Sequence, residues 1–386
     1  MKILIDLRAI QDGHFSGVEI FTRNVVKNLI KLNKKDKIFF WTNSYQKLSI
    51  SFIAFKKKLI NKKNVFFVHT KFPNKLLNLS LSLLRWPKID QIVIRKVRQE
   101  NKIKKIDLCF LPDLRPAPVS KKVRKIIFVH DLSFIHLKKT FSYFSRIWHL
   151  VLRYKKEFSE AASLLTPSKF TKKDLHQTLN IPLKKISVCP EAVEEKFFKV
   201  NPKQLSFIKK KYNLPSKFIL FIGTIQPRKN LSNLLLAFAD FQKKFPYQDL
   251  HLVIAGKANK KIFAKVKLKK IKKVIFTGFI EEKDKPALIQ ACYIFAFPSF
   301  FEGFSLPVLE AMAAGKPIIA SRLAPIEEFA KDCLLFFNPF SPKEICSTIE
   351  KIFFKMDLQK KLINNSLKRA KKFTWKKTTQ KILSKF

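Results

Sequence analysis

The sequence predicts an α/β protein of two doubly wound, Rossmann-like domains, and three observations carry this prediction. Short apolar runs alternate with longer amphipathic stretches along the 386 residues. The runs are apolar throughout, which indicates strands buried on both faces of a parallel sheet. The series is interrupted near residues 190–216 by a polar segment. Strand–helix alternation gives parallel sheets with right-handed crossovers, and a chain of this length suggests two domains.

The predicted strands form two series. The first lies at 2–7, 37–41, 65–69, 106–111, 125–130, 163–167 and 186–190, and the second at 218–223, 250–256, 274–278, 293–298, 317–321 and 334–337. Amphipathic stretches predict helices between them, among others at 18–32, 144–162, 230–244, 259–272, 306–314 and 343–355. The two domains then cover residues 1–195 and 196–365, with the irregular segment 191–207 as the hinge.

The charge of the chain is extreme, because 78 Lys and Arg against 28 Asp and Glu give a formal net charge of +50. Such an excess is either compositional drift, with lysine as the default exposed residue, or a basic surface for an anionic partner. Residues 301–350 escape the excess, with 4 basic and 7 acidic residues. This escape suggests that chemistry rather than solvation sets the residues of that segment.

The cysteines and the lengths of the apolar runs indicate the cellular compartment of the protein. Five cysteines in mostly apolar surroundings, with no Cys-x-x-Cys, argue against a disulfide framework or a zinc site and predict buried reduced thiols. The start MKILIDLRAI contains Asp6 and is typical of a strand rather than of a signal peptide. No run approaches the roughly 18 apolar residues that a spanning helix needs. We therefore expect a cytoplasmic protein.

The strongest candidate site lies at residues 298–321, PSFFEGFSLPVLEAMAAGKPIIAS. A strand ends there and a loop carrying Glu302 leads into a short helix. Ser305 is a plausible N-cap for this helix, and Gly315 is a plausible residue to end it. The alternative is an ordinary helix with one exposed Glu, preceded by a loop Glu.

Glu310 lies in the predicted helix, eight residues after Glu302, among apolar neighbours. A carboxylate there is costly to bury unless it is hydrogen-bonded, and ribose or sugar hydroxyls would satisfy it. The amides of Gly303, Phe304 and Ser305, at a helix amino terminus, suit a phosphate. These residue types together favour a ligand that combines hydroxyls with phosphate.

A second candidate is the segment FIGTIQPRKNLSNLLLAF, residues 221–238. Arg228 and Lys229 precede a helix that Asn230 could cap. Cations at a helix amino terminus oppose the helix dipole, so an anion between them would explain their placement. A diphosphate is the natural candidate. In a chain with 78 basic residues, one such pair is weak evidence by itself.

Two further candidates lie in the first domain. Gly13 and Gly17 bracket the turn into the first helix without the Gly-x-Gly-x-x-Gly pattern, so they either bring amides close to a phosphate or form an ordinary turn. His130 and Asp131 end a predicted strand, where ligands of open α/β sheets bind, although His69 also ends a strand and a structural role is the alternative. Asp-x-Asp, Gly-x-Ser-x-Gly, P-loop and His-Glu-x-x-His motifs are absent from the sequence.

The segment FEGFSLPVLEAMAAGKPIIAS resembles the signature of the retaining glycosyltransferases of family 4, a highly specific pattern of two Glu separated by seven residues. GTIQPRKNL resembles the second landmark of that family, and SGVEIFTRNVV, VHDLSF, TPSKFTKKDL and FTWKKTTQKIL also fit, so the resemblance covers essentially the whole chain. The RKN and VHDLS forms are most similar to mannosyltransferases of surface-polysaccharide and O-antigen assembly. The resemblance implies the GT-B fold, with two domains facing across a cleft and a C-terminal helix at 366–386 that packs back on the first domain.

The resemblance also implies a reaction. A hexose, with mannose from GDP-mannose favoured and a UDP-sugar as the alternative, moves from a nucleotide sugar to a glycan or lipid-linked glycan with retained configuration. No cofactor and no metal are expected. His130 and Glu302 are the implied catalytic residues, with Glu302 contacting the hydroxyls of the donor sugar and His130 near that sugar.

The remaining roles concern donor binding. The resemblance implies that Glu310 holds the ribose hydroxyls and that Arg228 and Lys229 neutralise the diphosphate leaving group, a transition-state effect. Donor contacts are also implied for Gly17 and for the amides of Gly303, Phe304 and Ser305. Three positions depart from the common pattern: many relatives have Arg at Thr224, Gly at Ser305, and Asn-Gly at Glu191-Ala192. These departures weaken the prediction of the donor more than that of the fold.

The partners expected from charge and resemblance are a nucleotide sugar, a glycan acceptor and an anionic membrane surface. Residues 1–195 carry 40 basic and 15 acidic residues, and each basic residue near an anionic leaflet contributes about 1 kcal/mol. The expected location is therefore cytoplasmic, peripheral on the inner face of the membrane. The alternative from another class is a non-enzymatic basic protein that binds nucleic acid or a membrane. Specific nucleic acid recognition is not expected, because the basic residues follow no module pattern. A phosphorylase-like or epimerase-like enzyme and an inactive scaffold are further alternatives.

Overall fold

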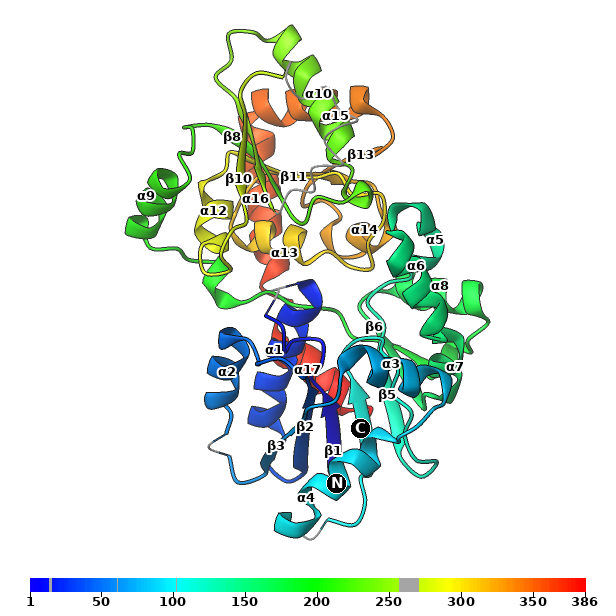
Figure 1. The fold of residues 1–386 in the computed structure, drawn as a ribbon. Coiled ribbons are helices and arrows are strands. Elements are labelled where there is room, and N and C mark those ends of the chain that lie inside the picture. Colours follow the sequence, from blue (N-terminus) through cyan, green and yellow to red (C-terminus); the bar gives the residue numbers. More distant parts are fainter. Residues whose placement is uncertain (14–15, 61, 102, 257–270) are drawn as a thin grey trace. The chain divides into compact units, whose positions relative to one another are not determined.

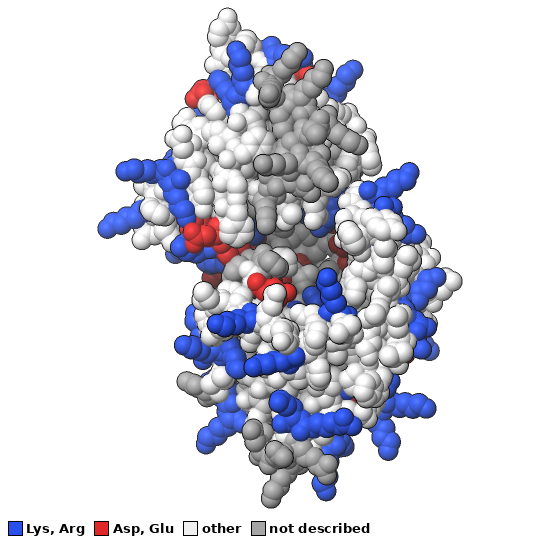
Figure 2. Space-filling view, in the orientation of Figure 1, with Lys and Arg blue, Asp and Glu red and all other residues white. Residues whose placement is uncertain are grey.

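The computed structural model describes residues 1–13, 16–60, 62–101, 103–256 and 271–386. These residues form two compact units (Figure 1). Unit 1 comprises Met1–Glu191 together with Trp375–Phe386, and unit 2 comprises Ala192–Thr374. The sequence had suggested divisions after residues 195 and 365. In Figure 2 lysine and arginine side chains project from many places on the visible surface, and acidic side chains are few there.

Unit 1 contains a seven-stranded parallel sheet in the order β3-β2-β1-β4-β5-β6-β7. Its strands are β1 (Lys2–Asp6), β2 (Lys37–Asn43), β3 (Val65–Thr70), β4 (Leu108–Leu111), β5 (Arg124–Phe128), β6 (Ser163–Thr166) and β7 (Ile186–Val188). Each lies where an apolar run predicted it. The strands are mostly apolar because helices cover both faces of the sheet, which leaves all four residues of β4 buried.

The helices of unit 1 are α1 (Gly17–Leu32), α2 (Ile50–Lys57), α3 (Asn74–Leu83), α4 (Ile89–Asn101), α5 (Ser133–His136), α6 (Tyr143–Val151), α7 (Tyr154–Glu160), α8 (Lys169–Leu179) and α17 (Trp375–Leu383). The prediction of one helix over 144–162 was wrong. Arg153 is left-handed (φ 51°) and separates α6 from α7. The two pieces face different surroundings, because α7 buries Glu157 and Phe158 whereas α6 buries no residue fully.

Unit 2 contains a six-stranded parallel sheet in the order β10-β9-β8-β11-β12-β13. Its strands are β8 (Phe218–Ile222), β9 (His251–Ala255), β10 (Val274–Gly278), β11 (Ile294–Phe297), β12 (Ile318–Ser321) and β13 (Leu335–Phe337). All six were predicted. The order runs outward in both directions from β8 and β11, so their carboxyl ends mark the switch point where such sheets bind ligands.

The helices of unit 2 are α9 (Pro202–Lys211), α10 (Leu231–Lys244), α12 (Lys285–Ala291), α13 (Leu306–Ala313), α14 (Ala324–Ala330), α15 (Pro342–Phe354) and α16 (Met356–Ala370). The predicted helix at 259–272 lies almost wholly outside the described residues. The predicted hinge 191–207 is irregular only in its first part, because Asn201 caps α9 and Pro202 occupies its first turn.

The C-terminal segment 366–386 is not one helix. α16 ends at Ala370 and α17 begins at Trp375, with a turn between them. α17 packs against α1, where the Trp375 and Phe21 rings lie 5.9 Å apart, and Thr378 Oγ1 donates a hydrogen bond to the carbonyl of Pro190 (2.7 Å). The last helix is therefore part of unit 1.

Two glycines bring the carboxyl ends of β8 and β9 close together. Gly223 follows β8 and donates its amide to the carbonyl of Ala255, and Gly256 follows β9. A Cβ atom built on Gly256 would lie 2.0 Å from the carbonyl oxygen of Gly223. Any other residue at 256 would have to push the two strand ends apart.

Two further expectations concern the state of the cysteines and the presence of membrane-spanning helices. All five cysteines are buried and unpaired. Among the helices of the described ranges, none is both long enough and apolar enough to cross a membrane.

Candidate functional site

Glu302 is the centre of a charged cluster at the switch point of unit 2. The loop after β11 carries it, and its Oε1 atom accepts hydrogen bonds from Lys229 Nζ (2.6 Å), Arg228 Nη1 (3.3 Å) and Ser299 Oγ (2.7 Å). The side chain of Glu302 is 11% exposed and that of Lys229 is 13% exposed. The anion that the sequence placed between the two cations is, in this structure, the carboxylate of the neighbouring loop.

The charges of this cluster keep Glu302 ionised. Burial by itself raises the pKa of its carboxyl group. The Lys229 and Arg228 charges, with the hydrogen bonds from Lys229 and Ser299, outweigh burial and hold the pKa of Glu302 below its ordinary value. Two cations and one carboxylate leave a formal charge of +1, so the cluster still attracts an anion.

Asn230 fixes the segment that carries the two cations. Arg228 and Lys229 lie in a single 3₁₀ turn (Pro227–Lys229), and Asn230 follows in a left-handed conformation (φ 55°). Its Nδ2 donates to the carbonyls of Pro298 (2.9 Å) and Pro339 (2.7 Å). Asn230 therefore does not cap α10 with its side chain, as the sequence suggested, but ties the cation-bearing turn to the Glu302 loop.

The loop before α13 holds the predicted amide donors. Gly303, Phe304 and Ser305 lie immediately before the first turn of α13. The ring of Phe304 is buried and stacks on that of Phe329, with 4.6 Å between the ring centroids. Only the backbone of Phe304 is therefore a candidate for contact with a ligand. Ser305 occupies the N-cap position, but its hydroxyl makes no capping bond, and Oγ is buried without a partner among the described residues.

Ser305 is also in a left-handed conformation (φ 105°), which favours glycine. Such a conformation costs a non-glycine residue about 1–3 kcal/mol, and glycine loses about 0.5–1 kcal/mol in chain entropy. We therefore expect Ser305→Gly to stabilise the protein by about 1 kcal/mol and to raise Tm by about 2–4 °C in calorimetry. Ser341→Gly is the matched control, because Ser341 caps α15 through its hydroxyl and its loss lowers stability by a few tenths of a kcal/mol. A lower Tm for Ser305→Gly would contradict this account.

Glu310 is buried on α13, with 2% of its side chain exposed, and Lys285 at the start of α12 is its partner. Lys285 Nζ lies 2.6 Å from Oε2 and donates to Oε1 at 2.9 Å. Burial raises the pKa of Glu310 to about 7, although the Lys285 charge lowers it in part. The carboxylate that the sequence left to ligand hydroxyls is thus compensated within the chain.

Lys285 is a site residue that the sequence did not reveal. It lies in the first turn of α12, directly after Asp284 at the N-cap, and nothing in its spacing links it to Glu310. A second group of charges lies beside it, in which Lys196 Nζ bridges the carboxylates of Glu194 (2.9 Å) and Glu282 (3.3 Å). The signal available in the sequence was the buried carboxylate itself, which requires a cation that only the fold supplies.

His130 follows β5 in unit 1 and is held on both sides. Nδ1 lies 3.0 Å from Glu191 Oε1, and Nε2 lies 3.0 Å from the carbonyl oxygen of Pro112. Burial by itself lowers the pKa of His130, but the hydrogen bond and charge of Glu191 and the charge of Asp113 raise it above its ordinary value. Both partners are acceptors, so the geometry favours the imidazolium form. Glu191 thereby orients the ring.

A cavity of about 290 Å³ adjoins His130 in unit 1. Its lining combines charged groups, two histidines and aromatic rings: Val18, Asp113, Leu114, Arg115, Val129, His130, Asp131, Ser133, Phe134, Phe141, Trp148, His149 and Leu152. Asp113 and Arg115 come from the loop after β4, with Arg115 Nε 3.5 Å from Asp113 Oδ2. Trp148 and His149 come from α6. Aromatic faces with hydrogen-bonding groups around them suit a sugar or another polar organic ligand.

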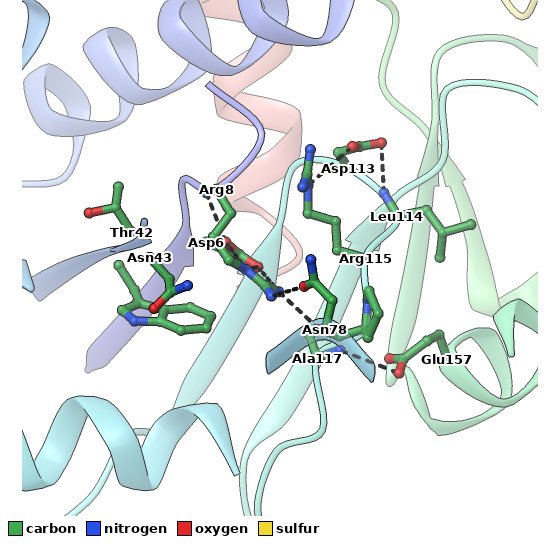
Figure 3. Close-up of polar contacts among 12 residues, drawn as sticks. Asp6, Arg8, Thr42, Asn43, Asn78, Asp113, Leu114, Arg115, Ala117 and Glu157 are labelled. Atoms are coloured by element: carbon green, nitrogen blue, oxygen red, sulfur yellow. Dashed lines mark hydrogen bonds and ion pairs between the residues drawn. The ribbon is translucent and has the colours of Figure 1, made fainter. Parts of the chain in front are cut away.

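The loop after β1 forms a closed polar network next to this region (Figure 3). Arg8 makes a bidentate pair with Asp6 (Nη2 to Oδ2, 2.6 Å), donates to Asn78 Oδ1 (3.0 Å) and lies 4.6 Å above the Trp41 ring. Arg8 is 4% exposed. Because these groups satisfy one another, the network shapes the strand ends and offers no site of its own.

Gly17 is the first residue of α1. Ser16 caps this helix, and its hydroxyl accepts a hydrogen bond from the backbone amide of Glu19 (3.3 Å). Within unit 2 the structure brings together Glu302, Arg228 and Lys229, whereas Glu310 has a different partner. Within unit 1 it places His130 beside the cavity. Gly17 is in unit 1 as well, and Val18, the next residue, lines the same cavity.

Comparison with known proteins finds a matching family model and similar chains. Residues 203–369 match the family model "Glycosyl transferases group 1". The chain is 28% identical over 242 residues to the serotype-specific mannosyltransferase WbdA of Escherichia coli, which covers 60% of this chain and 29% of that protein. It is 25% identical to the O-antigen chain mannosyltransferase B of Escherichia coli, covering 68% of this chain and 70% of the relative. The chain therefore spans less than a third of the length of WbdA.

Solved structures are similar over the whole chain. The crystal structure of Anabaena Alr3699/HepE in complex with UDP-glucose has a TM-score of 0.70 at 17% identity and covers 100% of both chains. The structure of WaaG, a glycosyltransferase involved in lipopolysaccharide biosynthesis, has a TM-score of 0.69 at 14% identity and covers 98% of both. At these identities the likeness shows the fold alone.

Proposed function

We propose a specific activity for this chain, which has the GT-B fold and whose residues 203–369 match the family model of group 1 glycosyl transferases. The protein transfers a hexose from a nucleotide sugar to a glycan or lipid-linked glycan acceptor, with retained anomeric configuration. We propose mannose from GDP-mannose as the donor, because WbdA and the O-antigen chain mannosyltransferase B are named mannosyltransferases. The UDP-glucose complex of Alr3699/HepE makes a UDP-sugar the alternative.

The observation that carries this proposal is the cluster of Glu302, Arg228 and Lys229 at the carboxyl ends of β8 and β11. Its formal charge of +1 and its place at the switch point suit the diphosphate of a nucleotide sugar. As the bond to the sugar breaks, the leaving diphosphate gains negative charge. Cations fixed beforehand by the Glu302 loop stabilise that charge without having to reorganise.

Glu302 has one oxygen left for the donor sugar. Its contacts with Lys229, Arg228 and Ser299 all go to Oε1, and no hydrogen bond from a described residue goes to Oε2. In the proposal a hydroxyl of the donor sugar donates to Oε2. The low pKa of Glu302 keeps this acceptor ionised at neutral pH.

Glu310 serves the ribose in this proposal. Its Oε2 carries the ion pair to Lys285 but no hydrogen bond, so it can accept a ribose hydroxyl. The amides of Gly303, Phe304 and Ser305 contact the sugar and the diphosphate at the amino terminus of α13.

In unit 1, the proposal places His130 near the donor sugar. Gly17, which has no side chain, lets the loop before α1 approach the diphosphate or the acceptor. The imidazolium form of His130, favoured by Glu191 and Pro112, adds a positive charge and a ring fixed in orientation. The reaction needs no metal in this proposal, because Arg228 and Lys229 balance the diphosphate charge. The protein acts in the cytoplasm, peripherally at the inner face of the membrane.

Thermal unfolding with GDP-mannose, UDP-glucose, ADP-glucose, TDP-glucose and the free diphosphates tests the donor. A ligand at 100 times its Kd stabilises by about 2.7 kcal/mol, which raises Tm by about 2 °C or more. We expect this shift with GDP and GDP-mannose, unchanged by EDTA. Lys229→Met should abolish it, whereas Lys243→Met, an exposed lysine on α10, should not. A shift with UDP compounds alone would replace the donor, and no shift with any compound would overturn the nucleotide-sugar site.

A further inference from the structure

α3 and α6 form a neighbouring helix pair on unit 1. They are in contact, and Ser82 Oγ on α3 donates a hydrogen bond to the carbonyl of Val151 at the end of α6. Neither the sheet nor the ion pairs of unit 1 cover their outer sides.

The outer sides of both helices are apolar and exposed. On α3, Leu76, Leu79 and Leu83 follow helical spacing and are 67%, 44% and 48% exposed, whereas Leu77 and Leu81 face the core. The other exposed apolar residues of the pair and its flanks are Phe72, Leu84, Trp86, Tyr143, Phe144, Ile147, Trp148 and Leu150. We call these eleven side chains the α3–α6 face. Exposed apolar side chains in this number on two neighbouring helices are typical of an interaction site.

The charge around the α3–α6 face has one sign. Residues 71–88 contain four basic side chains and residues 138–156 contain six, and neither segment contains an Asp or Glu. Arg85 pairs with Glu157 and Glu160, so its charge is already compensated within unit 1. The exposed cations are Lys71, Lys75, Lys138, Lys139, Arg146, Arg153, Lys155 and Lys156. In Figure 2 the surface over α6 is largely white, with blue side chains at its borders.

The tryptophans point to the same surface. Of the four in the chain, Trp41 is fully buried and Trp375 is 6% exposed, whereas Trp86 is 63% and Trp148 is 37% exposed. Both exposed tryptophans thus lie on the α3–α6 face. Tryptophan and tyrosine prefer the boundary between lipid headgroups and acyl chains, where an apolar ring also meets water.

We propose that the α3–α6 face is the surface through which unit 1 docks onto an anionic lipid membrane. The apolar side chains enter the headgroup boundary, and the lysines and arginines around them pair with anionic headgroups, the two contributions on which interfacial helices depend. α6 also lines the unit 1 cavity through Trp148 and His149, so docking brings that cavity to the lipid surface, where a lipid-linked acceptor is found. This inference deepens the proposed function at its membrane partner and rests on it for the acceptor.

Flotation with vesicles of 70% phosphatidylcholine and 30% phosphatidylglycerol tests the docking surface. We expect the wild-type protein to float with these vesicles at low salt and to be released as salt rises. Phe144→Glu with Leu150→Glu places two carboxylates in the face and should weaken binding roughly tenfold or more. Tyr247→Glu with Phe207→Glu, two exposed aromatic side chains of unit 2, is the matched control and should bind as the wild type does.

The cations are tested separately. One basic residue near an anionic leaflet changes the affinity by about fivefold. Replacing Lys138, Lys139, Lys155 and Lys156 by Gln should therefore weaken vesicle binding more than tenfold. The same change at Lys203, Lys210, Lys355 and Lys361, four exposed lysines of unit 2, should weaken it much less. Equal losses in the two sets would show that the net charge of the chain binds the membrane, without a defined face.

Tryptophan fluorescence provides a readout in the unmodified protein. On vesicle binding the emission of Trp86 and Trp148 should shift to the blue, and brominated lipids should quench it, while Trp41 and Trp375 stay unaffected. Trp86→Phe with Trp148→Phe should abolish the fluorescence response and retain flotation.

Three outcomes would overturn the proposal: no flotation of folded wild-type protein, full flotation of Phe144→Glu with Leu150→Glu, or quenching that persists without the two exposed tryptophans. If that double Glu variant instead converted a dimer into a monomer in sedimentation and still bound vesicles, the face would be a contact between two copies. The variants of this face should keep the Tm shift with nucleotide sugar. Loss of vesicle binding with a retained shift, or the reverse, separates failure of the docking surface from failure of the proposed transferase site.

Discussion

Glu302→Gln should lower kcat by about 10²–10³-fold while the protein keeps its fold. The substitution keeps the shape of the side chain but removes the charge that fixes Lys229 Nζ at 2.6 Å and Arg228 Nη1 at 3.3 Å. Without that charge the cations are no longer fixed before the diphosphate departs. Loss of one fixed electrostatic contact to developing charge costs enzymes of other families about this factor. Transfer of radiolabelled hexose to a glycan acceptor measures the effect.

Lys229→Met should cause a loss of similar size, because it removes a cation from the leaving group. The two changes act on one contact, so their combination should cost less than the product of the single effects. Asp357→Asn is a suitable control, since that carboxylate on α16 is fully exposed. If turnover is measured and both Glu302→Gln and Lys229→Met leave it intact, the site assignment is wrong.

Lys285→Met should reduce the free energy of unfolding by about 3–5 kcal/mol at pH 8. It removes the ammonium group beside Glu310, and a buried carboxylate without its partner carries an uncompensated desolvation cost. Lys283→Met, two residues away, removes an exposed ion pair and should change stability by less than about 1 kcal/mol. Denaturation by urea, followed by circular dichroism, measures both.

The effect of Lys285→Met should depend on pH, with a defined sign. The pKa of Glu310 is about 7 in the folded wild-type protein, above its ordinary value of 4.5, and loss of the Lys285 charge raises it further. The folded state then binds more protons than the unfolded state between these values, so the free energy of unfolding falls as pH rises through this window. We expect a smaller loss at pH 5.5 than at pH 8. A loss independent of pH would mean that packing, rather than charge, causes it.

The sequence determined where the strands lie along the chain. A strand buried on both faces is an apolar run, and such a run can be detected without tertiary information. It also singled out Glu302, Arg228 and Lys229 as candidate site residues, because they follow strands β8 and β11, whose carboxyl ends meet at one edge of the sheet. The interruption between α6 and α7 at Arg153 was not visible, because the amphipathic pattern continues across it. Tertiary contacts such as the ion pair of Glu157 with Lys125 (2.8 Å) are not written in that pattern.

The partners of the charged groups were decided by the tertiary structure alone. Lys285 meets Glu310 from another helix, and Glu191 meets His130 from a distant loop, so spacing along the chain carries no trace of either pair. The left-handed conformation of Ser305 likewise depends on how the Glu302 loop enters α13. Sequence patterns report which face of an element is buried, whereas the compensation of a buried charge depends on which elements the fold brings together.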